Sequence, residues 1–268
     1  MKVLFIPDTH LKFKVMEPFI EDVVSKYSIN QVVFMGDYTD AHNQTNNAFI
    51  YISDLLYLTQ FKEKLESQNI DCKFLLGNHD CHYLCEIPAD YTFTRDALTF
   101  INIQGLLYDL NIQPLYMLDN EILVSHAGFN KFYEPNPSLF EVLKSSSPHP
   151  DLALWTISAG VSRGGVLPTG NFLWNDKSDF EKYPNTNYPK QVVGHTPVET
   201  VCTLNDVWFT DTFSITPSNN KYGYDFLGDG SLLIYDGKSK KFEIISTLWK
   251  SNDTLKSIRD YFNSERKN

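Results

Sequence analysis

Side chains that can bind metal ions recur in five short segments of the chain. In order, these segments are Asp8-Thr9-His10, Gly36-Asp37-Tyr38-Thr39-Asp40, Gly77-Asn78-His79-Asp80, Ser125-His126-Ala127-Gly128 and Gly194-His195-Thr196. Carboxylate, amide and imidazole ligands without thiolate suit manganese, iron, zinc, cobalt or nickel better than calcium or a structural zinc. A carboxylate such as Asp37 has two oxygens and can bridge two ions. The set therefore predicts a binuclear metal centre.

Such a centre points to one kind of chemistry. Two divalent ions about 3.5–4 Å apart can clamp a phosphoryl group and lower the pKa of a shared water toward about 7. The activated water then attacks phosphorus in line with the leaving group. The ligand set therefore predicts hydrolysis of phosphoric esters.

The elements that position these segments are strands that come just before most of them. Apolar, strand-like runs are expected at Val3–Ile6, Val32–Met35, Lys73–Leu76, Ile122–Val124, Gln191–Val193, Val207–Thr210, Leu232–Tyr235 and Phe242–Ile245. The first three alternate with helix-like stretches, which indicates a parallel or mixed sheet. One such stretch, from Asn43 to about Gln68, is expected to be an amphipathic helix whose apolar stripe consists of Phe49, Ile52, Leu55, Leu56, Phe61 and Leu65. The later runs follow one another closely and predict a second sheet of hairpins and meanders. Side chains at the carboxyl ends of such strands can converge on one crevice.

The rest of the chain fits one catalytic domain over residues 1–268. From 129 to 188 the pattern breaks into a segment rich in Pro, Ser, Gly and Asn, with short helical pieces near Ser138–Lys144 and Asp151–Ala159. A long irregular excursion of this kind is usually functional, so we expect it to form a wall or cap of the active site. The alternative is a surface insertion. A closing helix is expected at Asn252–Phe262.

The composition of the chain limits the classes of substrate and binding partner that it suits. Twenty-three basic and 33 acidic side chains give a formal net charge of −10, which disfavours an extended nucleic-acid surface and favours a small phosphorylated substrate or a basic protein. No apolar run approaches the roughly 20 residues of a membrane helix, and the short apolar start predicts a strand rather than a signal peptide. We therefore expect a soluble, cytoplasmic protein. Its four cysteines are expected to be reduced, with a small metal cluster at Cys81, His82 and Cys85 as the alternative.

Taken together, the five segments resemble the calcineurin-like metallophosphoesterase superfamily, within it the branch of the phosphoprotein phosphatases and symmetrical diadenosine tetraphosphatases. Pro197 stands where many phosphodiesterase relatives have a further histidine, and Asp40 matches the phosphoprotein phosphatase pattern. Two further stretches resemble the branch, Phe172-Leu173-Trp174-Asn175-Asp176 and Thr210-Asp211-Thr212. The resemblance implies a mixed α/β (α+β) fold, a four-layer αββα sandwich of two mixed β-sheets flanked by helices.

The resemblance also implies a role for each site residue. Asp8, His10 and Asp37 would hold the first metal, and the bridging Asp37 would hold the second with Asn78, His126 and His195. His79 would be the general acid that protonates the leaving group. Its orienting carboxylate would be Asp40, with Asp80 as the next candidate and a local turn role as the alternative for Asp80. Two divalent ions are implied, with manganese preferred.

One departure concerns the substrate phosphate. Where the branch has an arginine and a glycine after its second motif, this chain has Ala41 and His42. Arg163 is the first candidate to replace the missing arginine and Arg95 the second, because a guanidinium can bind phosphate through two donors. His42 could also serve, although a solvated loop histidine is the alternative.

These observations predict a phosphomonoesterase similar to protein serine/threonine phosphatases, acting on a phosphoprotein or a nucleotide. The main alternative is hydrolysis of a nucleotide anhydride such as a dinucleoside tetraphosphate. A phosphodiesterase or nuclease and a metal-free scaffold are further alternatives. The nuclease is disfavoured by the net charge and by Pro197, and the scaffold by the presence of every expected ligand.

Overall fold

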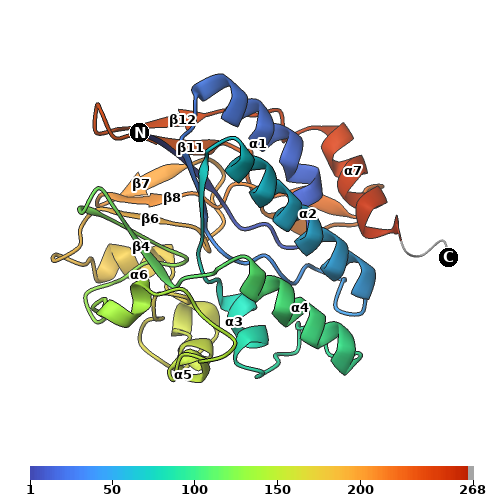
Figure 1. The fold of residues 1–268 in the computed structure, drawn as a ribbon, viewed down its shortest axis with the longest axis horizontal. Helices are drawn as coiled ribbons and strands as arrows, with labels where there is room; N and C mark the ends of the chain where they lie inside the picture. Colours follow the sequence, from blue (N-terminus) through green and yellow to red (C-terminus); the bar gives the residue numbers. More distant parts are fainter. Residues whose placement is uncertain (265–268) are drawn as a thin grey trace.

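Two five-stranded β-sheets form the centre of the computed structural model, which describes residues 1–264 (Figure 1). The first sheet has the order β12-β11-β1-β2-β3, and its strands are β1 (Lys2–Ile6), β2 (Gln31–Phe34), β3 (Asp71–Phe74), β11 (Leu232–Asp236) and β12 (Lys241–Ile245). The second has the order β4-β5-β6-β8-β7, with β4 (Leu115–Leu118), β5 (Ile122–Ser125), β6 (Gln191–Val193), β7 (Cys202–Leu204) and β8 (Val207–Phe209). Both sheets contain parallel and antiparallel pairs, so both are mixed.

The expected placement of the last two strands in the second sheet is wrong. β11 pairs antiparallel with β1, and β12 pairs with β11, so both extend the first sheet. The physical reason is the connection of the first half of the chain: β2 and β3 lie on one side of β1 and leave its other edge unpaired. The second sheet is also less of a meander than expected, because β5, β6 and β8 run parallel.

Alternating side chains of the first sheet bind it to the layers on its two faces. Val3 and Phe5 of β1 belong to a buried cluster with Val124 and Val192 of the second sheet. The intervening residues, such as Leu4, belong to the cluster formed with the helices. This period of two is the pattern of a strand buried on both faces.

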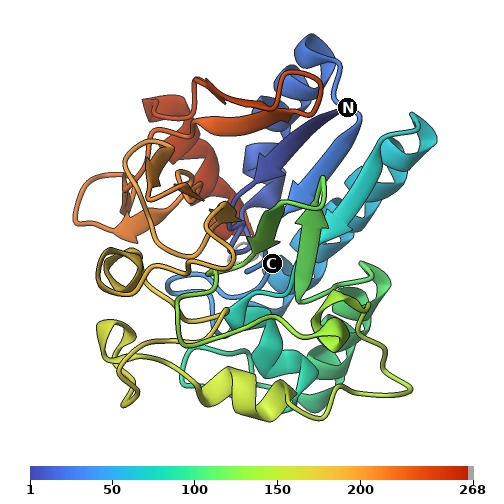
Figure 2. The same ribbon diagram turned by 90° about the vertical axis from the view of Figure 1, so that its left-hand side faces the viewer.

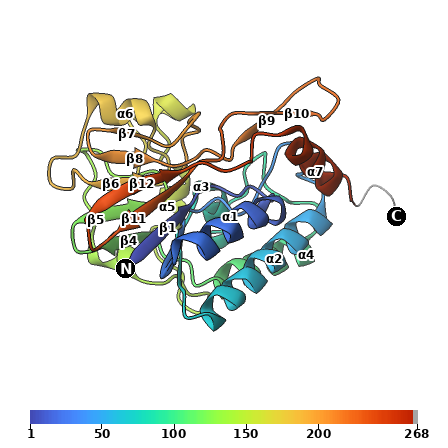
Figure 3. The same cartoon turned by 90° about the horizontal axis from the view of Figure 1, so that it is seen from above.

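Helices cover the outer face of each sheet, which confirms the four-layer αββα sandwich (Figure 3). The helices beside the first sheet are α1 (Phe13–Tyr27), α2 (Ala48–Ser67), α4 (Ala97–Asp109) and α7 (Asn252–Phe262). The outer layer of the second sheet is thinner: the short α6 (Lys177–Lys182) brings Phe180 against Val193 and Phe209.

Helix α2 begins at Ala48 and buries Leu55, Phe61 and Leu65 of the expected stripe, but not the whole stripe. Phe49 and Leu56 are 46% and 43% exposed, whereas Asp54 is buried. The carboxylate of Asp54 accepts the backbone N–H groups of Phe13 and Lys14 at 3.0 and 3.1 Å. These are the free donors at the start of α1, so a polar contact shares the buried face with the apolar side chains.

The segment 129–188 contains short helical pieces, as expected: η1 (Pro137–Phe140), α5 (Leu152–Ile157), η2 (Val161–Arg163) and α6. Figure 2 shows its yellow-green part along the lower edge of the molecule, below α3 (Asn78–Leu84). α5 packs against α3, where Thr156 donates to the Cys81 thiol. A two-stranded hairpin of β9 (Ile215–Pro217) and β10 (Tyr224–Phe226) completes the fold. The division into one domain with a cap stays a prediction.

None of the helices within residues 1–264 combines the length and apolar character that crossing a membrane requires.

Candidate active site

The five segments predicted to bind metal follow the ends of neighbouring strands. Asp8, Asp37 and Asn78 follow β1, β2 and β3 of the first sheet, and His126 and His195 follow β5 and β6 of the second. Within each sheet these strands are parallel, so their carboxyl ends lie at the same edge. The loops from the two sheets meet there, as the convergence of strand ends predicts.

Glycines allow the loops to approach closely. A Cβ atom at Gly36 would lie 2.6 Å from the backbone nitrogen of Gly77, and Gly36 has a φ of +99°. A Cβ at Gly77 would overlap the backbone nitrogen and carboxylate of Asp37, and one at Gly194 would overlap the carboxylate of Asp8. Any side chain at these positions would push a ligand out of place.

Three of the predicted ligands of the second metal surround the imidazole of the fourth, His126. Its Nε2 lies 2.9 Å from Asn78 Oδ1, 3.1 Å from His195 Nδ1 and 3.4 Å from Asp37 Oδ2. All of these residues are buried. Such a cluster of imidazole, amide and carboxylate donors has the composition of a transition-metal site.

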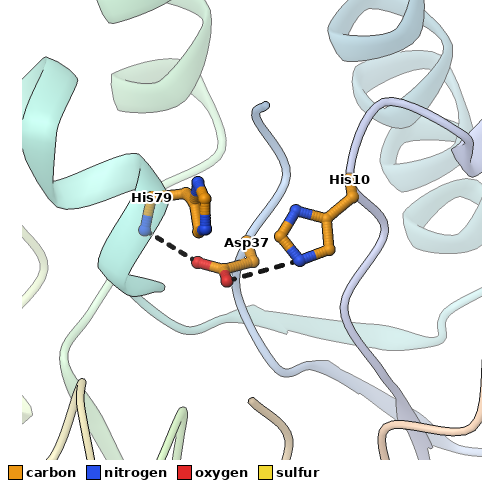
Figure 4. A group of neighbouring side chains, drawn as sticks. All are labelled: His10, Asp37 and His79. Atoms are coloured by element: carbon orange, nitrogen blue, oxygen red, sulfur yellow. Dashed lines mark hydrogen bonds and ion pairs between the residues drawn. The ribbon is translucent and has the colours of Figure 1, made fainter. Parts of the chain in front are cut away.

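Asp37 also belongs to a second group of donors. Its Oδ2 lies 3.6 Å from His10 Nε2, and its Oδ1 accepts the backbone N–H of His79 at 2.9 Å (Figure 4). Ligand atoms of His10, Asp37 and His79 all lie within 4.8 Å of one another. By proximity alone His79 could therefore be a ligand, so its predicted role as acid depends on its hydrogen bonds.

Asp8 lies next to the backbone of the other sheet's loop. Its two carboxylate oxygens lie 3.2 and 3.1 Å from the backbone nitrogen of His195, which donates to them. Asp8 is buried, and burial followed by repulsion from Asp211 raises its pKa well above the usual value. A buried carboxylate in such surroundings is stabilised when a cation binds next to it.

Hydrogen bonds to the far ring nitrogen fix the direction of two imidazoles. Nδ1 of His126 lies 2.8 Å from the carbonyl oxygen of Met35, and Nδ1 of His10 lies 2.9 Å from that of Asp40. A carbonyl can only accept, so each Nδ1 carries a proton and Nε2 is the nitrogen turned toward the other predicted ligands. Protein groups commonly orient metal-binding histidines in this way.

The electrostatics of the pair His126 and His195 are those of a site built for a cation. Burial lowers the pKa of His126, but the carboxylates of Asp37 and Asp8 outweigh it and raise the pKa to about 9. Burial, with the nearby His126, lowers the pKa of His195 well below its usual value. Its Nε2 is buried and has no hydrogen-bond partner among the described residues. The donor set therefore fits divalent metal ions.

His79 and Asp40, the predicted general acid and its orienting carboxylate, are within hydrogen-bond distance of each other. Nδ1 of His79 lies 2.9 Å from Asp40 Oδ2, while Asp40 Oδ1 accepts the hydroxyls of Tyr51 and Tyr83, each at 2.6 Å. The two tyrosines hold the carboxylate still. Burial lowers the pKa of His79, but Asp37 and Asp40 outweigh it and raise the pKa to about 9, which favours the cationic acid form at neutral pH.

Asp80 has a structural position. Its carboxylate accepts the backbone N–H groups of Asp37, Tyr38, Thr39 and Gly77 at distances of 2.8, 2.9, 3.1 and 3.1 Å. These hydrogen bonds hold the backbone of the loop that contains Asp37. The structure therefore favours the local backbone role for Asp80 over an interaction with His79.

The structure distinguishes among Arg163, Arg95 and His42, the three candidates for phosphate binding. A cleft of about 470 Å³ opens over the metal-binding side chains, and both Arg163 and His42 line it. Arg95 is not among the lining residues; it is exposed, and its Nη1 lies 3.4 Å from the carbonyl oxygen of Asn46. His42 is exposed at the rim of the cleft, and partial desolvation together with the nearby His79 and Lys12 lowers the pKa of its imidazole, which disfavours the charged form.

Arg163 is held in place by residues next to the site. Its Nε forms an ion pair with Asp176 at 2.9 Å, and its Nη2 donates to Thr196 Oγ1 at 2.8 Å. Thr196 follows the predicted ligand His195 directly, so the guanidinium lies beside the metal-binding loop. Of the other two candidates, Arg95 lies outside the cleft, and the lowered pKa of His42 disfavours a positive charge on its side chain.

Two buried residues of the cleft, Asp211 and Lys12, were given no role in the predicted site, although Asp211 lies in one of the stretches that resemble the branch. Asp211 follows β8, beside β6, and its Oδ1 has no hydrogen-bond partner among the described residues. The rule of strand ends could have found it, because a strand up to Thr210 was expected. The Nζ of Lys12 donates to the carbonyl oxygens of Asp8 and Thr9 at 3.2 and 2.8 Å. No pattern in the sequence singles Lys12 out.

The alternative of a metal cluster near Cys81 is not supported within residues 1–264. Both nitrogens of His82 are engaged, Nδ1 with the carbonyl oxygen of Ile87 and Nε2 with the hydroxyl of Tyr91, each at 2.7 Å. Cys81 and Cys85 are free thiols that share the hydroxyl of Thr156.

Known proteins share this architecture. The sequence profile of the calcineurin-like phosphoesterases matches residues 1–227, whereas no curated protein matches the chain in sequence. A cold-active protein-tyrosine phosphatase of a psychrophilic Shewanella species is 17% identical, with a TM-score of 0.51 over 91% of this chain and 80% of that one. A protein serine/threonine phosphatase from Saccharomyces cerevisiae, with similarity to human phosphatase PP5, is 13% identical, with a TM-score of 0.51 over 92% and 80%. These two likenesses concern the fold. The profile covers most of the chain, which therefore belongs to the calcineurin-like phosphoesterase family and is a phosphoester hydrolase.

Proposed function

We propose that the chain is a dimetal-dependent phosphomonoesterase resembling protein serine/threonine phosphatases. The observation that carries the proposal is the convergence of donor atoms around Asp37 Oδ2, which lies 3.6 Å from His10 Nε2 and 3.4 Å from His126 Nε2. One carboxylate oxygen thus contacts both groups of predicted ligands. This arrangement suits a carboxylate that bridges two ions.

In this proposal each group of ligands holds one divalent ion. Asp8, His10 and Asp37 would hold the first, and Asp37, Asn78, His126 and His195 the second. Bound ions supply Lewis acidity and make water a nucleophile near neutral pH. Manganese is the expected ion and the cytoplasm the expected compartment, both on the grounds of the sequence.

The chain's own residues bind the substrate and deliver a proton. The guanidinium of Arg163 donates to the phosphoryl oxygens, an interaction strengthened by its positive charge. His79 Nε2 is the nitrogen left free by the bond between Nδ1 and Asp40, so it carries the proton that the leaving-group oxygen receives. Asp40 stabilises the imidazolium form and fixes the ring.

The charges of the cleft favour a phosphomonoester over a dinucleoside tetraphosphate. Among the described lining residues, the lysine and arginine side chains are Lys12 and Arg163. Lys12 is buried and donates to two backbone carbonyls, which leaves Arg163 as the accessible side chain of these two. A tetraphosphate chain carries several charges and requires several such partners. Pro197, which lines the cleft, supplies no imidazole of the kind that many diesterases have there.

A panel of substrates tests this proposal. We expect the manganese-loaded protein to hydrolyse an aryl phosphomonoester and a phosphopeptide at least about tenfold faster, in kcat/KM, than the matching diester or a dinucleoside tetraphosphate, a difference of about 1.4 kcal/mol. Released phosphate and nucleotide products are measured side by side. Preference for the tetraphosphate would instead establish the anhydride hydrolase, and preference for the diester a phosphodiesterase.

Replacing Arg163 tests the phosphate site. The change Arg163→Ala should lower kcat/KM for a phosphomonoester by about 10- to 100-fold, because a hydrogen bond to a charged group contributes about 1.5–3 kcal/mol. Arg95→Ala is the matched control, since it removes the same charge outside the cleft and should leave kcat/KM within about twofold of the wild type. The opposite ranking of the two variants would refute the assignment of Arg163.

A further inference from the structure

Tyr91 lies next to His79, the predicted general acid, in the wall of the cleft. Its ring centroid is 4.5 Å from that of His79, with 45° between the planes, and both residues line the cleft. On another side, the ring of His79 meets that of His10 edge to face at 4.9 Å. The tyrosine ring is 37% exposed, so part of its surface is open to a ligand.

The ring of Tyr91 is fixed in this position. Its hydroxyl lies 2.7 Å from Nε2 of His82, and Nδ1 of His82 lies 2.7 Å from the carbonyl oxygen of Ile87. Because the carbonyl of Ile87 must accept, Nε2 of the neutral imidazole accepts the tyrosine hydroxyl. His79 and His82 belong to the same helix, α3. The aromatic surface therefore keeps a constant relation to the acid and loses little entropy when a ligand binds.

The predicted acid places the leaving group of a substrate in the same part of the cleft as Tyr91. The proton of His79 is on Nε2, because Nδ1 is bonded to Asp40. The oxygen that receives the proton must come within hydrogen-bond distance of Nε2. Tyr91 shares the cleft with His79 and its ring contacts that of His79, so it is within reach of a group attached to that oxygen. The chemistry of the leaving group is thus sensed at this residue.

We propose that Tyr91 selects phosphomonoesters whose leaving group is aromatic, as in a phosphorylated tyrosine side chain or a small aryl phosphate. This inference rests on the proposed phosphomonoesterase function and specifies its substrate class. An aromatic leaving group can stack on Tyr91 in an offset or tilted arrangement, whereas the short aliphatic chain of a phosphoserine has no such face.

The remaining walls of the cleft suit the same class of substrate. The indole of Trp174 also lines the cleft, edge to face with His195 at 6.1 Å. Apolar atoms of Ile215, Leu227 and Phe262 line the cleft as well. A phenyl group and the apolar part of a peptide would be desolvated favourably against these walls.

The reaction is a hydrolysis with a phenol as leaving group. The oxygen of water forms a bond to phosphorus, and the bond between phosphorus and the aryl oxygen breaks with its electron pair on that oxygen. The phenol leaves with the proton of His79 Nε2. The attacking water loses one proton, which replaces the proton given up by His79. Water and the aryl phosphate therefore yield phosphate and a phenol with no other reactant.

The test compares two peptides of identical sequence that carry the phosphate on tyrosine or on serine. We measure kcat/KM for each with manganese-loaded wild type, Tyr91→Leu and Tyr91→Phe. The ratio of the two values cancels the intrinsic reactivity of each ester when variants are compared. Tyr91→Leu should lower the ratio by about three- to tenfold, and Tyr91→Phe, which keeps the ring, should leave it within about twofold.

Other outcomes overturn the inference. Equal losses on both peptides would show that Tyr91 acts only on His79 or His82. Phenyl phosphate should lose the same factor as the phosphotyrosine peptide in Tyr91→Leu, and a loss confined to the peptide would exclude stacking of the leaving group. If the wild type hydrolyses none of these monoesters, the proposed function itself fails. If it hydrolyses them with a ratio that Tyr91→Leu does not change, only the selectivity fails.

A measurement on the wild type alone guards against unfolding of a variant. Benzylphosphonate and cyclohexylmethylphosphonate have equal numbers of carbon atoms and no cleavable ester, and only the first has an aromatic face. The aromatic compound should inhibit with a competitive inhibition constant at least about threefold lower. Equal constants would contradict a role for Tyr91 in recognising aromatic groups.

Discussion

Asp37→Asn is expected to lower kcat/KM for a phosphomonoester by about a thousandfold or more. The substitution keeps the shape and one acceptor oxygen, so the backbone N–H of His79 still has a partner. It removes the negative charge from the one side chain whose oxygen contacts both ligand groups. Loss of several kcal/mol of metal-derived stabilisation, at about 1.4 kcal/mol per factor of ten, gives this magnitude.

Metal content and activity are measured on the same sample of Asp37→Asn. Elemental analysis should find about two ions per chain in the wild type and fewer in the variant. Asp22→Asn is the control, because Asp22 is an exposed acid on α1 that pairs with Lys26. A variant that keeps both ions and activity within tenfold of the wild type would refute the bridging role of Asp37.

His79→Gln should lower kcat by about 10²- to 10⁴-fold on esters with a poor leaving group, which is the range for loss of a general acid. The loss should be far smaller for 4-nitrophenyl phosphate, whose leaving group needs little protonation. The measurement is therefore kcat against the pKa of the leaving group, which should become steeper in the variant. His149→Gln, outside the cleft, is the control. A uniform loss on all esters, together with loss of an ion, would indicate that His79 is a metal ligand.

Asp40→Asn provides an independent measure of the same pair. The carboxylate of Asp40 raises the pKa of His79, so the protonated acid persists to higher pH. Removing the carboxylate lowers that pKa, and the alkaline limb of the plot of kcat against pH should move to lower pH. Bound cations would offset the contribution of Asp37, which leaves Asp40 as the main group that holds the proton on His79.

Much of the site could be predicted because it depends on local rules. Strands end at polar loops, parallel strands end at one edge, and Gly36, Gly77 and Gly194 mark the places where those loops meet. The same rules extend to Asp211. The pairing of β11 with β1 could not be predicted, because it depends on which strand edge remains free after the first half of the chain has folded.

The choice among Arg163, Arg95 and His42 also required the tertiary structure. Each is a plausible phosphate donor by residue type alone. Only the packing of the segment 129–188 brings Arg163 against Asp176 and Thr196. The surroundings that lower the pKa of His42, which are partial desolvation and the nearby His79 and Lys12, likewise exist only in the folded chain. Long irregular segments carry little periodic information, so the position of their side chains cannot be inferred from spacing.

The origin of the ligands in two sheets has a consequence for how the protein is assembled. The first sheet supplies Asp8, Asp37 and Asn78, the second supplies His126 and His195, and the contact between Asp8 and His195 spans 187 positions of the chain. The first sheet alone carries the predicted ligands of the first ion, but those of the second ion are divided between the two sheets. Tight binding of the second ion must therefore follow the docking of the sheets during folding. By mass action, the second bound ion then favours the docked state over any partly folded state in which the sheets have separated or slipped. The metal centre would thus act as a fastener between the two halves of the sandwich as well as a catalyst.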